Sequence, residues 1–340
     1  MHNKKQMQRL REWALYQLLT PVRFGFEWWM KRQNAVLLYC IMGNGLGDAM
    51  AISTILNAMH EKYGTRGIVF SMHPDLFAHN PQVIRNLSYK AMSSGSRSLF
   101  KILLRALRGP AVICIGGEVW TVGTNPLDTR DLKKQKQAGW NWLQKLLPDY
   151  QPPISYEGIY PKVFFSAEEE QRFAAKYQSL KQPFAILKAS VGVNRPKSAY
   201  LKDWDLEKIA EVVAQTPQVQ WVQLGDKTEA PIPGTLNLLG QTSIREAMWL
   251  VRQSRFILSV EGFITHAAAA FNIPAITPLT GAYDPKTFVY RNTIPLMAKP
   301  MPACSPCWAD QCVVAGMPCR SGITTTQAVE AVTQALQKDL

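Results

Sequence analysis

A glycine-rich turn followed by an acid is the first group of residues that could carry chemistry. The apolar run 35–42 predicts a buried strand, and Gly43, Gly45 and Gly47 follow it, just before Asp48 at the start of a predicted helix. Such glycines allow a tight turn and a close approach of the backbone to a ligand, while a helix start presents free N–H groups. Asp48 serves either as a helix N-cap or as a carboxylate that removes a proton from an incoming hydroxyl group. The spacing is neither the G-x-G-x-x-G dinucleotide fingerprint nor a P-loop.

Further polar motifs follow predicted strands in the second half of the chain. In order they are Lys188-Ala189-Ser190, Lys202-Asp203-Trp204, Leu224-Gly225-Asp226-Lys227-Thr228-Glu229, Leu239-Gly240-Gln241-Thr242-Ser243 and Val260-Glu261-Gly262-Phe263-Ile264-Thr265-His266. An acid at the carboxyl end of an apolar strand, such as Glu261, favours a functional role over mere solvation. Lys202 taken alone would be a surface lysine. His266 precedes an alanine-rich helix, so a buried structural histidine explains it as well as a ligand contact does.

Four of the six cysteines crowd into 16 residues near the C-terminus. They are Cys304, Cys307, Cys312 and Cys319, with the spacing C-x2-C-x4-C-x6-C. Four thiolates in so short a loop predict a closed, structural site for zinc or iron, and the alternative is that these cysteines are free. Cys40 and Cys114 lie inside apolar, strand-like runs. This usage is typical of a reducing compartment rather than of a disulfide framework.

Short apolar runs alternate with helical stretches, which predicts an α/β fold with parallel sheets. The predicted strands are 35–42, 67–71, 111–115, 184–188, 219–224, 256–260 and 275–279, and the predicted helices are 48–62, 98–107, 204–215, 243–253, 262–271 and 324–338. We expect a basic amphipathic leader (1–33) and two doubly wound Rossmann-like domains (34–165 and 166–340), with the four-cysteine loop (304–319) in the second. Such domains bind ligands at the carboxyl ends of their strands, so we expect the two to face a central crevice.

The positive charge of the 340-residue chain lies almost entirely in its first half. The formal net charge is +13, yet residues 1–150 hold 20 Lys and Arg against 9 Asp and Glu, while residues 151–340 hold 18 against 16. With 47% hydrophobic and 19% charged residues the chain is neither disordered nor a small disulfide scaffold.

The leader mixes basic and aromatic residues, which suits either a helix lying on an anionic membrane or a helix packed on its own domain. No apolar stretch is long enough to span a bilayer and no signal peptide is evident, so we expect a cytoplasmic protein.

The motif set resembles glycosyltransferase family 9, the lipopolysaccharide heptosyltransferases. The resemblance rests on the Gly-Leu-Gly-Asp turn, Lys-x-Trp, Leu-Gly-x-Thr-Ser and the acid five residues before a His-Ala-Ala helix, which occur in the family's order over residues 35–335. It implies a GT-B fold and an inverting sugar transfer that needs no catalytic metal. It also implies that Asp48 is the general base and that donor binding involves a set of residues in the second domain: Ser190, Lys202, Glu229, Glu261, Gly262 and His266. Autotransporter heptosyltransferases that resemble this family carry a four-cysteine iron site.

The sequence departs from the family in one motif. The family's Asp-Ser/Thr-Gly is replaced here by Glu261-Gly262-Phe263, which marks a divergent branch. We expect transfer of a sugar such as heptose from a nucleotide-diphosphate donor, with ADP favoured, to a lipopolysaccharide or other lipid-linked surface polysaccharide. This would occur on the inner face of the cytoplasmic membrane. The alternatives are a protein heptosyltransferase that acts on an autotransporter or adhesin, and a nucleic-acid-binding module. The second alternative is disfavoured because the cysteine loop lies in the nearly neutral half.

Overall fold

The chain forms two compact units in the computed structural model, residues 1–124 and 125–340. The structure describes residues 14, 17–18, 20–40, 45–90, 92–93, 96, 112–115, 160–192, 201–281, 290–307 and 312–337. The domain boundary expected after residue 165 stays a prediction, since most of the chain before it lies outside these ranges. Among the helices described, none combines the length and the apolar character that crossing a bilayer requires.

The first unit contains a four-stranded parallel sheet in the order β3-β2-β1-β4. Its strands are β1 (Ala35–Cys40), β2 (Arg66–Ser71), β3 (Val83–Ser88) and β4 (Val112–Ile115). Helix α3 (Leu46–Tyr63) joins β1 to β2 and packs on β1, β2 and β4, and the 3-10 turn η1 (Pro74–Phe77) joins β2 to β3. The strand order reverses between β1 and β4, so the switch point of this sheet lies between these two strands.

Helix α2 (Thr20–Arg32) precedes β1 and packs on it. Pro21 lies in the first turn of α2, where a missing N–H costs no hydrogen bond. Met30 is fully buried, whereas Phe24, Trp28 and Trp29 are exposed. The helix therefore uses one side to contact its own unit and presents aromatic side chains on the remainder.

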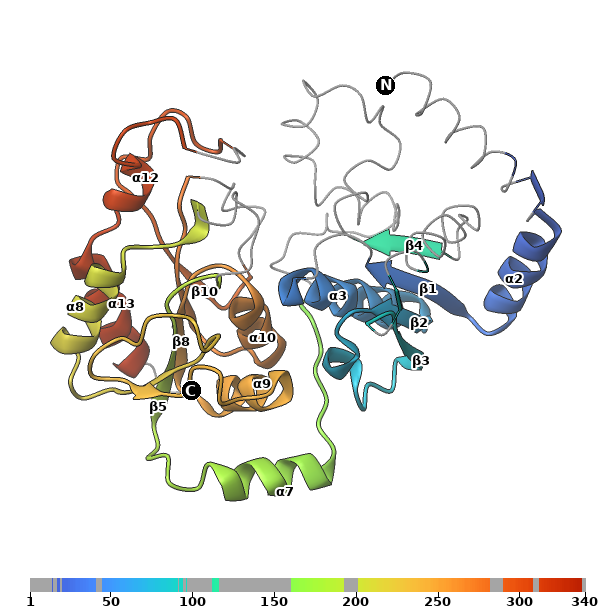
Figure 1. Ribbon diagram of the computed structural model, residues 1–340, viewed down its shortest axis with the longest axis horizontal. Helices are drawn as coiled ribbons and strands as arrows, with labels where there is room; N and C mark the ends of the chain where they lie inside the picture. The colour runs from blue at the N-terminus through green and yellow to red at the C-terminus, as the bar shows by residue number, and fades with distance from the viewer. Residues whose placement is uncertain are drawn as a thin grey trace. The chain divides into compact units, whose positions relative to one another are not determined.

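The second unit contains a six-stranded parallel sheet in the order β10-β9-β8-β5-β6-β7. Its strands are β5 (Phe184–Lys188), β6 (Gln220–Gln223), β7 (Leu236–Asn237), β8 (Phe256–Ser259), β9 (Ala275–Pro278) and β10 (Thr293–Leu296). Helices α8 (Leu206–Gln215) and α13 (Thr325–Gln337) pack together, as do α9 (Ile244–Gln253) and α10 (Phe263–Phe271). Figure 1 shows the two pairs on opposite sides of the sheet. The sheet is therefore doubly wound, and its switch point lies between β5 and β8.

A buried core fixes the sheet of the second unit against α8 and α13. Trp204 and Trp221 are almost completely buried in it, and each indole N–H has an acceptor. The Trp204 N–H donates to the carbonyl of Ile323 (3.4 Å), and the Trp221 N–H donates to Thr216 Oγ1 (3.1 Å). Paired N–H groups remove the cost of burying an indole, so these large side chains contribute their full apolar area to the core.

Helix α7 (Ala167–Lys176) and the short helix α12 (Pro318–Ser321) complete the second unit. Capping boxes start both α7, at Ser166, and α9, at Ser243. Arg245 on α9 binds both carboxylate oxygens of Glu169 on α7, at 3.0 and 2.5 Å. This bidentate pair attaches α7 to the helical layer that covers one side of the sheet.

The strands that the sequence pattern misses, β3, β7 and β10, all lie at the edges of their sheets. β3 has partly or fully exposed side chains along its whole length, so it lacks the apolar run that identifies a buried strand. β10 contains Pro295, and β7 has only two residues. The predicted strands and helices of the second unit are confirmed, with small shifts at their ends. The predicted helix 98–107 lies outside the described residues.

Candidate functional site

The carboxyl ends of β5 and β8 lie side by side at the switch point of the second sheet. Lys188, the last residue of β5, is in register with Ser259 of β8, and its carbonyl accepts the N–H of Val260 (3.2 Å). Glu261 follows at once and precedes α10. In doubly wound sheets this is the position at which ligands bind. Two of the motifs predicted to bind the donor, those that begin at Lys188 and Val260, therefore meet at the carboxyl-terminal end of this sheet.

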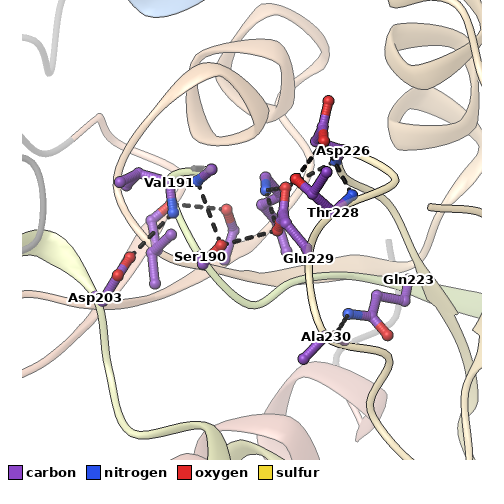
Figure 2. A network of polar contacts seen from close by, with 12 residues as sticks. Ser190, Val191, Asp203, Gln223, Asp226, Thr228, Glu229 and Ala230 are labelled. Atoms are coloured by element: carbon purple, nitrogen blue, oxygen red, sulfur yellow. Dashed lines mark hydrogen bonds and ion pairs between the residues drawn. The ribbon is translucent and has the colours of Figure 1, made fainter. Parts of the chain in front are cut away.

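Residues 201–203 lie at the carboxyl-terminal end of the sheet. Each of the three forms a hydrogen bond or an ion pair with a residue that follows a different strand. The carbonyl of Leu201 accepts the hydroxyl of Thr280, after β9, at 2.5 Å. The ammonium of Lys202 forms an ion pair with Glu261, after β8. The carboxylate of Asp203 accepts the backbone N–H of Val191, after β5, at 3.0 Å, as Figure 2 shows. Because the residues on either side of Lys202 each form a hydrogen bond, the backbone position of Lys202 is fixed.

The Lys202–Glu261 pair lies at the margin between buried and exposed. The side chain of Lys202 is 22% exposed and that of Glu261 is 9% exposed. Burial would raise the pKa of Glu261, but the ammonium of Lys202 against the carboxylate holds this pKa below its ordinary value. Both groups are therefore charged at neutral pH. The lysine retains enough exposure to reach an anionic ligand, while its partner is shielded.

His266, on α10, lies next to Glu261 of this pair. Its Nδ1 lies 2.7 Å from the hydroxyl of Tyr290, and its Nε2 lies 3.8 Å from Glu261 Oε1. Burial lowers the pKa of His266 to about 4, so the imidazole is neutral at physiological pH. An ionised carboxylate can only accept, which favours the tautomer with the proton on Nε2 and a Tyr290 hydroxyl that donates to Nδ1. In this arrangement His266 supports Glu261 and does not act as an acid or base.

We predict that acidification destabilises the fold through His266. The pKa of His266 in the fold, about 4, is below the ordinary histidine value of 6.5, so the unfolded chain binds more protons between these two pH values. The free energy of unfolding should therefore decrease as pH falls through this window, by about 3 kcal/mol at most. Urea denaturation of the wild type and a His266→Asn variant at pH 7 and pH 4.5 measures it. An imidazole of His266 that titrates above pH 6 in an NMR titration would contradict the prediction.

Glu229 forms the centre of a second polar cluster, after β6. Its two carboxylate oxygens accept the ammonium of Lys188, at 2.5 and 2.6 Å. One oxygen also accepts the Ser190 hydroxyl (2.9 Å), and the other accepts the backbone N–H of Asp226 (2.8 Å). Figure 2 shows Glu229 between Ser190 on one side and the Asp226–Thr228 turn on the other. Ser190 and Glu229, both expected at the donor site, are thus directly bonded to each other.

Gly225 makes room for this carboxylate. A Cβ atom at residue 225 would lie 2.7 Å from Glu229 Oε1 and 2.8 Å from a methyl group of Leu239. Neither neighbour can withdraw, because the first is bonded on both oxygens and the second is buried. With both oxygens engaged, Glu229 is placed to hold Lys188 and Ser190 at the strand ends.

The predicted catalytic turn of the first unit is only partly described. Gly45 is the N-cap of α3 in extended conformation, and Gly47 lies in the first turn of the helix. Asp48 is therefore the third residue of α3 and not its N-cap. An acid in a first helical turn is favoured by the helix dipole. Gly43 and the side chain of Asp48 lie outside the described part of the chain.

The four predicted metal-binding cysteines are described, and none forms a disulfide. Burial raises the pKa of the Cys319 thiol, a hydrogen bond from the Gly281 backbone lowers it, and the other three thiols raise it further. The other three thiols are therefore close enough to Cys319 to act on its pKa. Within the described residues, no three His, Cys, Asp or Glu side chains are already arranged to hold a metal ion.

Two residues of the site were not predicted from the sequence as binding or catalytic residues. Lys188 stands in the first of the polar motifs, and the structure places it against Glu229 with its side chain 17% exposed. Tyr290 carries no motif, and only the fold brings it to His266. An alternation of apolar and polar residues cannot reveal a partner 24 positions away.

Comparison with known proteins gives matches only at the level of structure. No protein-family model matches the sequence, and no curated protein matches it either. Among the solved structures that match, three illustrate the resemblance over most of the chain. Heptosyltransferase II of E. coli, which is named for ADP-heptose and LPS, is 16% identical, with 88% of this chain and 98% of that chain covered at a TM-score of 0.57.

The other two structures have slightly higher TM-scores. A glycosyltransferase family 9 protein of Veillonella parvula is 11% identical, with 90% of this chain and 98% of that chain covered at a TM-score of 0.60. The iron-containing dodecameric glycosyltransferase TibC of enterotoxigenic E. coli is 15% identical, with 89% of this chain and 76% of that chain covered at a TM-score of 0.60. At identities this low the structural similarity shows the fold alone. It confirms the predicted GT-B class with its two parallel α/β domains.

Proposed function

We propose that this protein is an inverting glycosyltransferase. It transfers a sugar, such as heptose, from a nucleoside-diphosphate donor to a lipopolysaccharide or related surface polysaccharide. The observation that carries the proposal is the anchoring of Lys202 across three strand ends at the switch point of a GT-B domain. A partly exposed ammonium that is held from three sides is suited to a diphosphate at this position. Structures with the same fold contain ADP or ADP-D-β-D-heptose, which favours ADP as the nucleotide.

The chemistry requires only side chains of this chain. Asp48 takes the proton of the acceptor hydroxyl as that oxygen attacks the anomeric carbon from the side opposite the leaving group. Lys202 balances the charge that develops on the departing diphosphate, and the N–H groups at the start of α10 add to this stabilisation. Ser190, Glu229, Glu261, Gly262 and His266 shape the donor site around them. Since lysine and N–H groups neutralise the diphosphate, no catalytic metal is needed.

A panel of nucleotides and nucleotide sugars tests the proposal by thermal shift. Ligand at 100-fold excess over its Kd stabilises by about 2.7 kcal/mol, which raises Tm by on the order of 5 °C in a domain of this size. ADP and ADP-sugars should stabilise more than UDP, GDP and their sugars. A protein whose Tm responds to none of them would contradict a nucleotide-sugar donor.

We further propose that α2 and the residues before it bind the cytoplasmic face of an anionic membrane. Large apolar side chains are exposed here, namely Leu18, Val22, Phe24, Trp28 and Trp29. Lys31 and Arg32 end the helix, and the Arg32 guanidinium lies 5.4 Å from the centre of the Trp28 ring. Tryptophan beside cations is favoured in the headgroup region, where the ring is half-buried and the charge meets anionic lipid.

Liposome co-sedimentation tests the membrane proposal. A Trp28→Ser/Trp29→Ser variant should lose most of its binding to vesicles that contain phosphatidylglycerol, because it removes the interfacial rings and keeps the charges. Tyr63→Ser serves as the control, since Tyr63 is also an exposed aromatic residue of the same unit. Equal sedimentation of all three proteins would refute the role of α2.

We also propose a structural zinc or iron ion at the four-cysteine loop. Four thiolates are a donor set that suits either metal, and the loop gathers them close enough to affect the Cys319 pKa. Because they are not already arranged as ligands, binding would draw Cys304, Cys307, Cys312 and Cys319 together. The iron-containing TibC has the same fold as this chain.

Metal analysis of the purified protein gives the expected outcome for this loop. We predict one zinc or iron per chain, lost in a Cys304→Ser/Cys307→Ser variant, with a fall in Tm because metal binding adds to folding free energy. Cys40→Ser should keep the metal, since Cys40 lies on β1 of the other unit. Metal-free wild-type protein whose Tm is unchanged by added zinc or iron would exclude the site.

A further inference from the structure

The strand end after β9 lies between the four-cysteine loop and the segment that carries Lys202. Thr280 is 4% exposed, and its hydroxyl donates to the Leu201 carbonyl at 2.5 Å. Gly281 follows, and its carbonyl accepts the backbone N–H of Cys307 at 3.0 Å. Two neighbouring residues thus contact the proposed donor site on one side and the cysteine loop on the other.

Gly281 is in close contact with the cysteine loop. A Cβ atom at residue 281 would lie 3.0 Å from Cys319 Cβ, 3.0 Å from Ser305 Cβ and 3.1 Å from Ser305 Oγ. Ser305 and Cys319, near the two ends of the loop, therefore both lie close to this residue, and a methyl group would fit only if they shifted by a few tenths of an ångström. A change in the position of Cys307 would act on Gly281 through the hydrogen bond between them.

A second contact joins the end of the cysteine loop to the same segment. Arg320 Nε lies 3.1 Å from Asp205, and the Lys208 ammonium donates to the carbonyls of Ser321 and Ile323, both at 2.7 Å. Arg320 and Asp205 are about one-third exposed, with side-chain values of 33% and 27%, so their ion pair adds little energy. The buried path through Thr280 and Gly281 is the stronger connection.

We propose that Thr280 and Gly281 transmit the closure of the four-cysteine loop to Lys202, so that Thr280 is a positioning residue for the donor-phosphate lysine. Thr280 holds the carbonyl immediately before Lys202. Losing this bond frees one of the three anchors of residues 201–203, and the ammonium then departs from its place beside Glu261. The inference rests on the proposed function only where it assigns Lys202 to the donor phosphate.

A double-mutant cycle with Lys202 tests the coupling. Thr280→Val removes the hydroxyl and keeps the shape, and it should weaken binding of ADP-heptose about tenfold by isothermal titration calorimetry. Thr280→Ser should restore binding. In a Lys202→Met background, Thr280→Val should cost nothing further, because the residue it positions is absent. An equal loss in both backgrounds, or no loss in either, would overturn the proposal.

Matched variants separate positioning from stability. Thr277→Val is the control, since Thr277 is a buried threonine whose hydroxyl donates to the Ala275 carbonyl on its own strand (3.4 Å), and the variant's donor affinity should equal that of the wild type. Gly281→Ala should reproduce Thr280→Val. Adding Ser305→Gly to Gly281→Ala removes two of the three close contacts and should recover part of the affinity. Failure of Gly281→Ala to weaken binding would exclude the link to the cysteine loop.

An NMR readout keeps the coupling testable without any donor. With lysine labelled at the ε-carbon, the Lys202 signal reports the ion pair with Glu261. Thr280→Val should move this signal and Thr277→Val should not. A shifted signal in a protein that binds no nucleotide sugar would defeat the proposed function and keep the coupling. An unchanged signal, together with unchanged nucleotide binding, would defeat the coupling and keep the function.

Discussion

Asp48→Asn is expected to slow sugar transfer by about 10²–10⁴-fold, the range typical of a lost general base. Asparagine keeps the size and polarity of the side chain but cannot take the proton of the acceptor hydroxyl. Donor affinity should be unchanged, because Asp48 belongs to the first unit and the residues proposed to bind the donor belong to the second. The measurement is the initial rate of transfer at saturating donor, together with the Kd for ADP-heptose from calorimetry.

Two outcomes decide the role of Asp48. Asp75→Asn is the matched control, because it changes an exposed acid of the same unit and should transfer at the wild-type rate. If Asp48→Asn is as active as the wild type, another group is the base. If it instead loses donor affinity at an unchanged maximal rate, Asp48 is a binding residue and the assignment of roles between the two units is wrong.

Lys202→Met is expected to produce the second large effect, a loss of donor affinity of about 10²-fold or more, since charge-assisted bonds to a diphosphate are among the strongest polar contacts. The variant also leaves Glu261 buried without its ion pair, and breaking such a pair costs about 3–5 kcal/mol. The free energy of unfolding should therefore fall. Calorimetry with ADP-heptose and urea denaturation measure the two effects separately.

A double variant separates the loss of charge from the loss of stability. Lys202→Met/Glu261→Gln leaves no unpaired charge, so it should recover much of the stability but none of the donor affinity. Lys181→Ala, a change at an exposed lysine of the same unit, should affect neither quantity. Recovery of donor binding in the double variant would show that Lys202 acts only by satisfying Glu261.

The sequence predicts the sheets of this protein better than their edges. Central strands such as β5 and β8 are continuous apolar runs because helices cover both of their faces, and a run of this kind is visible without a structure. β3 is exposed along its length and β10 carries a proline, so neither has that signal. The strand order follows only from the pairing of residues far apart in the chain.

The candidate site shows the same division between local and distant information. The resemblance to the family's motifs predicts Lys202 and Glu229, and for Glu261 the place directly after an apolar strand adds to it. The bonds that fix them were not predicted, because the partners Thr280, Lys188 and Tyr290 lie 79, 41 and 24 positions from the residues they bind. Glu229 illustrates the consequence. Its type and place indicate a ligand contact, yet its oxygens are occupied by Lys188, Ser190 and a backbone N–H.

Transfer of a labelled sugar tests the central claim most directly. Purified wild-type protein is incubated with radiolabelled ADP-heptose and a heptose-deficient lipopolysaccharide, and label in the lipopolysaccharide is measured with and without EDTA. We expect label that depends on Asp48 and Lys202, has the inverted anomeric configuration and is unchanged by EDTA at a concentration that leaves the proposed metal of the four-cysteine loop bound. Absence of label with ADP-heptose and with every other nucleotide sugar tried, from protein that is folded, would contradict the claim.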